Sequence, residues 1–160
     1  MQTNKEIIVK TQAELENIDK DFGGYIYLEG GMEYNPLILR KKYEFATIVA
    51  RGNCQLVMQG NSTVQDMQDN STVQYMWGDS IVQHMWDSST VQHMWGNSTV
   101  QHMWGNSTVQ EMEDNSTVQH MWGNSTVQEM EGSSTVQEMR GNSTVQLDRK
   151  CDEEMESECG

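Results

Sequence analysis

The sequence predicts an all-β fold, a parallel β-solenoid built as a two-sided β-roll or β-helix, with about 18 residues per coil and an N-terminal capping helix. From Gly60 onward, ten consecutive nonapeptides follow the pattern Gly-Asn-Ser-Thr-Val-Gln-x-Met-x. Within them Val and Met scarcely vary, whereas the residues on either side of Met change freely. Only 36% of the chain is hydrophobic, with 13 Met and two Phe, so a conventional layered core is not expected.

Each nonapeptide is expected to form one short strand and one tight turn. Helical solenoids need units of about 30 residues or more, whereas nine residues rich in Thr and Val and punctuated by Gly-Asn suit a strand. The constant positions, Val64 and Met67 in the first unit, should point into the core. They are three residues apart rather than two, so an extra residue should lie between the two inward positions, as in a β-bulge or a corner. Each buried Val or Met then contributes about 1.5–3 kcal/mol.

The other repeat positions have expected roles too. Ser62 and its copies should point inward, with their hydroxyls satisfying turn amides. Gly60-Asn61 supplies residues that tolerate positive φ. Thr63 and Gln65 should point outward, where the Gln side chains of successive coils can form amide ladders.

Nine residues cannot enclose a core, so two or three units must make one coil. Two units per coil place similar residues above one another, whereas three units would scatter them, and two are therefore predicted. Ten units then form five coils, about 24 Å long. On one face the residues before Met read Asp66, His84, His102, His120 and Glu138, and those after it read Gln68, Trp86, Trp104, Trp122 and Arg140. On the other face they read Tyr75, His93, Glu111 and Glu129, and Trp77, Trp95, Glu113 and Glu131.

Residues 1–59 are expected to form an N-terminal cap and the first, irregular coils. A strand is predicted at 7–9, and Thr11-Gln-Ala-Glu14 is a capping box that opens a short helix to about Ile18. After a turn at 21–24, strands are predicted at residues 25–28, 37–39 and 46–50. The helix should cover the open end of the solenoid and so prevent stacking into fibres.

Charge divides the chain into the same regions. The formal net charge is −14, and residues 60–147 hold one basic residue against ten acidic ones. We assign 60–148 to the nonapeptide-repeat solenoid and 149–160 to an acidic C-terminal tail, which is a cap or a disordered segment. The acidic field repels phosphate backbones, so direct nucleic-acid binding is not expected, whereas a basic partner is favoured.

The cellular setting is expected to be the cytoplasm. Cys54, Cys151 and Cys159 fit neither a disulfide framework nor a zinc pair, as in a reduced compartment. Residues 1–10 lack the apolar stretch of a secretory signal, and no run of about 18 apolar residues could span a membrane.

The aromatic columns are the first candidate binding site. Exposed rows of aromatic side chains often mark an interface, although stacked identical rings also stabilise a solenoid by packing on one another. We therefore predict a protein partner, or self-association as a homodimer through the Trp face. The residues expected to make this contact are Trp86, Trp104, Trp122, His84, His102, His120, Trp77 and Trp95.

Enzymatic and metal sites are not predicted. Three imidazoles in a straight line do not converge on a tetrahedral metal centre, and no Cys lies at ligand spacing. No Ser/His/Asp or paired-carboxylate arrangement stands out from the repeats, so the protein is expected to be non-enzymatic and to need no cofactor. The stacked imidazoles should have depressed pKa values unless nearby carboxylates outweigh their mutual repulsion.

Other functions stay open as alternatives. Glu111, Glu113, Glu129 and Glu131 form an acidic strip, which is either a solvated surface or the contact surface of an inhibitor that mimics nucleic acid toward a basic host or defence protein. The Trp rows could also bind polysaccharide, as parallel β-helices often do. Ice binding is a remote fourth option, because each face offers Thr-Val-Gln instead of a Thr-x-Thr array.

Two resemblances to known families follow from these motifs. The nonapeptide period resembles the calcium-binding RTX β-roll, but Ser62 and Ser71 stand where that family places its ligand Asp, so its calcium site is missing. The GNSxV units, together with residues 7–15, 25–28 and 48–53, resemble short-repeat β-solenoid proteins of bacteria and their phages. This second resemblance implies a fold and a bacterial or phage setting, with no established activity.

Overall fold

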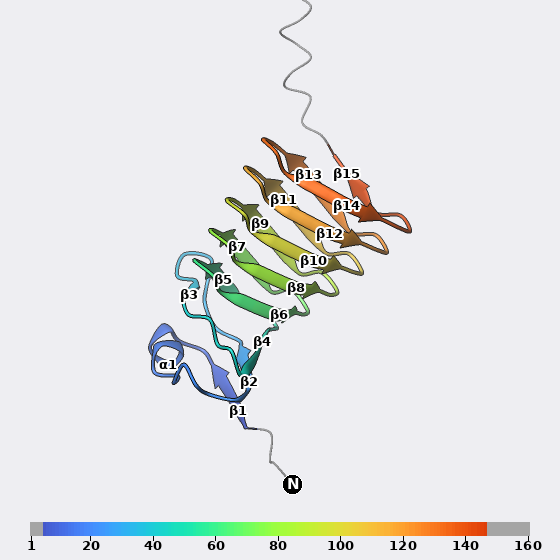
Figure 1. Cartoon of the computed structure of the whole chain (residues 1–160). Helices are drawn as coiled ribbons and strands as arrows, with labels where there is room; N and C mark the ends of the chain where they lie inside the picture. The colour runs from blue at the N-terminus through green and yellow to red at the C-terminus, as the bar shows by residue number, and fades with distance from the viewer. Residues whose placement is uncertain (1–4, 147–160) are drawn as a thin grey trace, which may run out of the picture.

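The chain winds into a parallel β-solenoid of about eight turns in the computed structural model, which describes residues 5–146 (Figure 1). Successive strands alternate between two sheets. The eight-stranded sheet contains, in order, β1 (Glu6–Val9), β2 (Gly24–Leu28), β4 (Ala46–Ala50), β6 (Thr63–Met67), β8 (Ile81–Met85), β10 (Thr99–Met103), β12 (Thr117–Met121) and β14 (Thr135–Met139). The seven-stranded sheet contains β3 (Leu37–Leu39), β5 (Gln55–Met58), β7 (Thr72–Met76), β9 (Thr90–Met94), β11 (Thr108–Met112), β13 (Thr126–Met130) and β15 (Thr144–Val145).

The strand register confirms two nonapeptides per coil. Val100 of β10 lies beside Val82 of β8 on one side and beside Val118 of β12 on the other. The same offset of 18 residues holds in the seven-stranded sheet, where Val109 pairs with Val91 and Val127. Every second repeat therefore stacks directly on its equivalent.

The core consists of the two constant positions of the repeat. Val and Met are completely buried in the central coils, for example Val100 and Met103 at 0% exposure. Between them the paired register omits Gln101 and resumes at His102, so the expected extra residue lies at this Gln. The irregularity begins where the N-terminal coils meet the repeats, because the pairing of β5 with β7 shifts between Leu56 and Val57.

The inward Ser side chains correct one expectation. Ser62, Ser71, Ser80, Ser89, Ser98, Ser107, Ser116 and Ser125 are all fully buried, as predicted. Their hydroxyls, however, have no hydrogen-bond partner within the described residues. In several turns the backbone amide of Ser makes the hydrogen bond across the turn instead. In one of them the amide of Ser71 donates to the Gln68 carbonyl at 3.2 Å. The hydroxyl of Ser143 does form a bond, to the Arg140 carbonyl at 3.0 Å.

Amide ladders form along the turns rather than along the strands. Asn124 donates to the side chain of Asn106, and Asn142 donates to Asn124, each at 3.3 Å and one coil apart. The expected ladder of Gln65 and its copies is not seen among the described residues; Gln74 instead donates to Gln55, which lies at the Thr position of its coil, at 3.2 Å. The bulge at the Gln position explains the difference, since it breaks the regular alignment on which a ladder depends.

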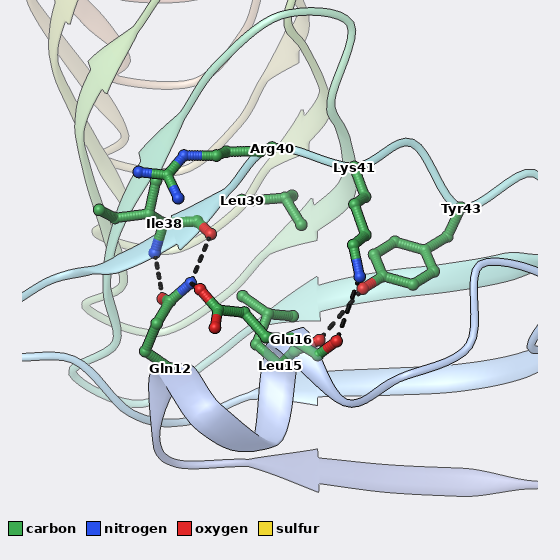
Figure 2. A pocket seen from close by; sticks show the side chains of 8 residues that line it. All are labelled: Gln12, Leu15, Glu16, Ile38, Leu39, Arg40, Lys41 and Tyr43. Atoms are coloured by element: carbon green, nitrogen blue, oxygen red, sulfur yellow. Dashed lines mark hydrogen bonds between the residues drawn. The ribbon is translucent and has the colours of Figure 1, made fainter.

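The N-terminal elements match the expected strands to within a residue, and the helix α1 (Gln12–Glu16) begins at the expected capping box. The Gln12 side chain accepts a hydrogen bond from the Ile38 amide at 2.7 Å and donates one to the Ile38 carbonyl at 3.1 Å. These two hydrogen bonds occupy the Ile38 backbone groups that a further strand would otherwise bond at the edge of β3 (Figure 2). The helix thus covers the edge of the seven-stranded sheet, whereas β1 is the outermost strand of the other sheet.

The opposite end of the core is more open. Val136 and Val145 are only partly buried, and Met139 is 42% exposed, because β14 and β15 are the last strands of the two sheets within residues 5–146. The predicted acidic tail at 149–160 also lies outside the described residues.

Candidate functional site

The first candidate surface is the outer side of β8, β10 and β12, here called the His/Trp face. His84, His102 and His120 are register partners, so the predicted column of imidazoles exists. The Trp side chains follow Met by one residue, and their backbone amides continue the ladder, as where Trp104 donates to Met85 at 2.9 Å. Parallel pairing of identical repeats therefore places all six rings on one surface.

The rings of this face stack in two adjoining columns. The centroids of Trp86 and Trp104 are 4.0 Å apart, and those of Trp104 and Trp122 are 5.0 Å apart. Imidazole centroids are 5.4 Å apart between His84 and His102 and 5.0 Å apart between His102 and His120. The flat faces of the inner rings are consequently covered, and the columns present ring edges outward.

Carboxylates bracket the histidine column at both ends. Asp66 contacts His84 Nδ1 at 3.1 Å and also accepts a hydrogen bond from the Trp86 indole at 3.1 Å. At the other end Glu138 contacts His120 Nδ1 at 2.9 Å and pairs with Arg140 at 2.6 Å. The Arg140 and His120 hydrogen bonds lower the pKa of Glu138. The acidic groups of this face are thus engaged within it.

His102 occupies the centre of the column and differs from its neighbours. Its Nδ1 is buried and lacks a hydrogen-bond partner within the described residues. Burial lowers the pKa of His102, and the adjacent His120 and His84 lower it further. Its neutral form is therefore favoured, as predicted for stacked imidazoles.

The same surface extends further than the repeats suggest. Tyr25 and Tyr27 of β2 stack with centroids 6.0 Å apart, and the Arg51 guanidinium lies 3.9 Å from the Tyr27 ring centroid. Arg51 also pairs with Glu29 at 2.5 Å. The repeat pattern does not predict this group. Only the i, i+2 spacing of the two tyrosines signals it, because the irregular first coils provide no repeated copies to align.

The second candidate surface is the outer side of the seven-stranded sheet, here called the graded face. Trp77 and Trp95 stack with centroids 5.7 Å apart, and Tyr75 stacks on His93 at 5.1 Å. His93 then contacts Glu111 at 2.6 Å in the next coil. The side chains of the graded face therefore change from aromatic to acidic between β9 and β11.

The acidic strip is assembled as predicted on β11, β13 and the residues that follow them. Glu111 of β11 and Glu129 of β13 are register partners. The backbone amide of Glu131 donates a hydrogen bond to the carbonyl of Met112, the residue before Glu113, so Glu131 lies one coil from Glu113. These four glutamates and Met112 line a small hollow. Among residues 5–146, no group of three or more His, Cys, Asp or Glu is arranged to hold a metal ion.

A cavity of about 320 Å³ lies between α1 and the chain of β3 and the residues that follow it (Figure 2). Lys41 donates to the Glu16 carbonyl at 3.1 Å, and the Tyr43 hydroxyl donates to the Leu15 carbonyl at 3.2 Å. With the two Gln12 bonds, these contacts attach the helix to the sheet. The polar groups of the cavity are largely engaged in holding the cap.

Comparison with protein-family models, curated proteins and solved structures finds no match to this chain. In the described part of the chain, no helix is both long enough and apolar enough to cross a membrane.

Proposed function

We propose that this protein is a non-enzymatic β-solenoid scaffold that binds a protein partner through its His/Trp face. The observation that carries the proposal is the double stack of six rings on three adjacent strands. The stack holds the aromatic side chains in fixed positions, so little side-chain entropy is lost when a partner covers them.

The chemistry of this face favours a partner with an apolar surface. Asp66 and Glu138 are engaged with the columns they bracket, so the patch between them carries little free charge. Trp86 is 37% exposed. Burial of such aromatic edges at an interface is favourable and depends only weakly on salt.

A polysaccharide ligand is less favoured by the same geometry. Sugar rings stack on open aromatic faces, and Trp104 has Trp86 on one side and Trp122 on the other. Only the rings at the ends of a column could offer a face.

The second candidate function is that of an acidic inhibitor that mimics nucleic acid. The observation in its favour is the set of four glutamates on two adjacent coils. It requires a strongly basic partner, and its binding should weaken steeply as salt rises.

We place the protein in the cytoplasm of a bacterium or of a phage-infected cell. Burial raises the pKa of the Cys54 thiol to about 12, which keeps it protonated and unreactive. A buried thiol of this kind is compatible with a reducing compartment.

The test replaces Trp86, Trp104 and Trp122 with Ser. The tagged wild-type chain and this variant are used to capture proteins from bacterial lysate, and the protein retained by the wild type is purified. Titrations then compare its binding at about 0.05 M and 0.5 M salt. The proposal expects binding to the wild type that changes little with salt and is lost in the variant.

A matched control replaces Trp77 and Trp95 with Ser on the opposite face. This control should retain the partner, and circular dichroism should show that both variants keep their β structure. Equal binding by the wild type and the Trp86, Trp104 and Trp122 variant would refute the proposal. Steep salt dependence with loss of binding in a Glu111, Glu113, Glu129 and Glu131 variant would favour the acidic inhibitor instead.

A further inference from the structure

The graded face has a charge pattern that neither sheet pairing nor the core explains. From β3 to β13, each strand of this face ends on an inward Leu or Met. The residues that follow it form a column that runs, coil by coil, through Arg40, Gln59, Trp77, Trp95, Glu113 and Glu131. The residues that precede it form a second column, through Ile38, Val57, Tyr75, His93, Glu111 and Glu129. The face is thus basic at its N-terminal end, aromatic in the middle and acidic at its C-terminal end.

Arg40 and Glu131, at its two ends, form no ion pair among the described residues. Arg40 is exposed, and its side chain donates to the neutral Gln59 at 3.2 Å. Glu131 is also exposed and, within residues 5–146, forms no ion pair. The two side chains lie five strand spacings apart, about 24 Å, too far to interact within one molecule.

We propose that this face binds a second copy of the same chain in an antiparallel homodimer. A twofold axis parallel to the strands, placed between β7 and β9, reverses the order of the coils. Arg40 of each copy then lies opposite Glu131 of the other, and Trp77 lies opposite Trp95. Such an isologous interface is self-complementary, with two basic-to-acidic contacts around one aromatic centre.

A parallel arrangement of two copies through this face is unfavourable. An axis along the solenoid would place the four glutamates of one copy against the same four of the other. Like charges facing one another oppose association, so on this face the charge pattern favours the antiparallel direction.

The size of the face suits a weak dimer. About the proposed axis, six strands of each copy overlap, β3 to β13, and at about 4.8 Å spacing and about 17 Å length they give roughly 490 Å² per copy, or about 980 Å² for both. Interfaces that bury less than about 1,200 Å² are typically weak. The loop before β3 also rises over this face, because the Glu33 carbonyl accepts a hydrogen bond from Gln74 at 2.8 Å. Its neighbours Met32 and Tyr34, 74% and 94% exposed, add apolar area for the second copy.

The decisive experiment measures the mass of the full chain in solution by sedimentation equilibrium, for the wild type and two charge reversals. The wild type is expected to dimerise. Arg40→Glu and Glu131→Arg should each place like charges together twice and weaken dimerisation by about tenfold or more. A one-to-one mixture of the two variants should dimerise again. In the mixed dimer the two introduced charges, which are opposite in sign, face one another at one end, and the unchanged Arg40 and Glu131 face one another at the other.

Lys20→Glu is the matched control, because it makes the same charge change at an exposed site in the turn between α1 and β2, a strand of the other sheet. It should dimerise like the wild type, and so should the variant with Ser at 86, 104 and 122. A monomeric wild type at about 0.1 mM, unchanged dimerisation of both charge reversals, or a mixture that stays monomeric would overturn the proposal. None of these results would affect partner binding by the His/Trp face.

Discussion

Trp86 and Trp104 are 18 residues apart in the sequence, yet their ring centroids lie 4.0 Å apart with 23° between the ring planes. The distance is shorter than the usual spacing between neighbouring strands, about 4.8 Å, so the side chains tilt toward one another. The rings are therefore part of the packing that holds successive coils together, in addition to being a surface for a partner.

Replacement of Trp104 with Ala tests this stabilising role. Trp104 stacks on Trp86 and Trp122 and lies 5.4 Å from His102 between centroids, so the variant loses several ring contacts at once. At about 0.5–1.5 kcal/mol for each aromatic pair, we expect the free energy of unfolding to fall by about 1–3 kcal/mol. Denaturant unfolding measures the change.

The control for this prediction is Trp122→Ala. Trp122 has a Trp neighbour on one side only, because Arg140 occupies the equivalent position in the next coil. The loss should be smaller than for Trp104→Ala. Equal losses would mean that ring stacking is not the source of the stability.

The histidine column makes stability depend on pH. The pKa of His102 is lowered in the folded protein by burial and by its two His neighbours. As pH falls below the pKa of His in the unfolded chain, about 6.5, the folded state therefore binds fewer protons than the unfolded state. Stability from this residue is full above that pH and is lost as pH falls toward the folded pKa. We expect the melting temperature to fall between about pH 7.5 and pH 5.5.

His102→Gln separates this effect from other titrations. The variant keeps a polar side chain at the centre of the column but cannot gain a proton. Its melting temperature should change less than that of the wild type over the same pH range. Identical pH profiles for the two proteins would exclude His102 as the source.

The sequence was sufficient to predict the coil and its columns because the repeats act as their own alignment. Asp66, His84, His102, His120 and Glu138 could be placed in one column from periodicity alone, and the register agrees. Ring tilts and side-chain partners could not be obtained this way. They depend on rotamers in three dimensions, which the pattern of residues does not determine.

The N-terminal coils were predicted less completely for a related reason. Their strands follow from alternation, but the contact of Arg51 with Tyr27 joins residues without repeated copies. The bonding of Gln12 to the backbone of Ile38 likewise depends on where the helix lies against the sheet. Long-range contacts of this kind leave no periodic signal in the chain.

Gln12→Ala tests whether this side chain protects the sheet edge. The variant removes the acceptor for the Ile38 amide and the donor for the Ile38 carbonyl, at about 1 kcal/mol for each hydrogen bond. Hydrogen exchange should report faster exchange at the Ile38 amide, with little change at Val109 in the central coils. Gln12→Glu keeps an acceptor for the amide and should preserve more of its protection. Unchanged exchange at Ile38 in the Ala variant would contradict this role.

The buried hydroxyls lead to an expectation opposite to the usual one for a core substitution. Ser98 is fully buried, and its Oγ has no hydrogen-bond partner within the described residues, so the folded state bears an uncompensated desolvation cost. Ser98→Ala removes that cost and leaves only a small gap. We expect the free energy of unfolding to stay unchanged or to rise by up to about 1 kcal/mol.

Ser143→Ala is the comparison that isolates the hydroxyl. Ser143 occupies the same position of the repeat, but its Oγ donates to the Arg140 carbonyl at 3.0 Å, so its removal loses a bond. That variant should be destabilised by about 0.5–1.5 kcal/mol, or less to the extent that solvent replaces the bond. Chemical denaturation of both variants measures the difference. A clear loss of stability in Ser98→Ala would mean that its hydroxyl has a partner in solution, such as a buried water molecule.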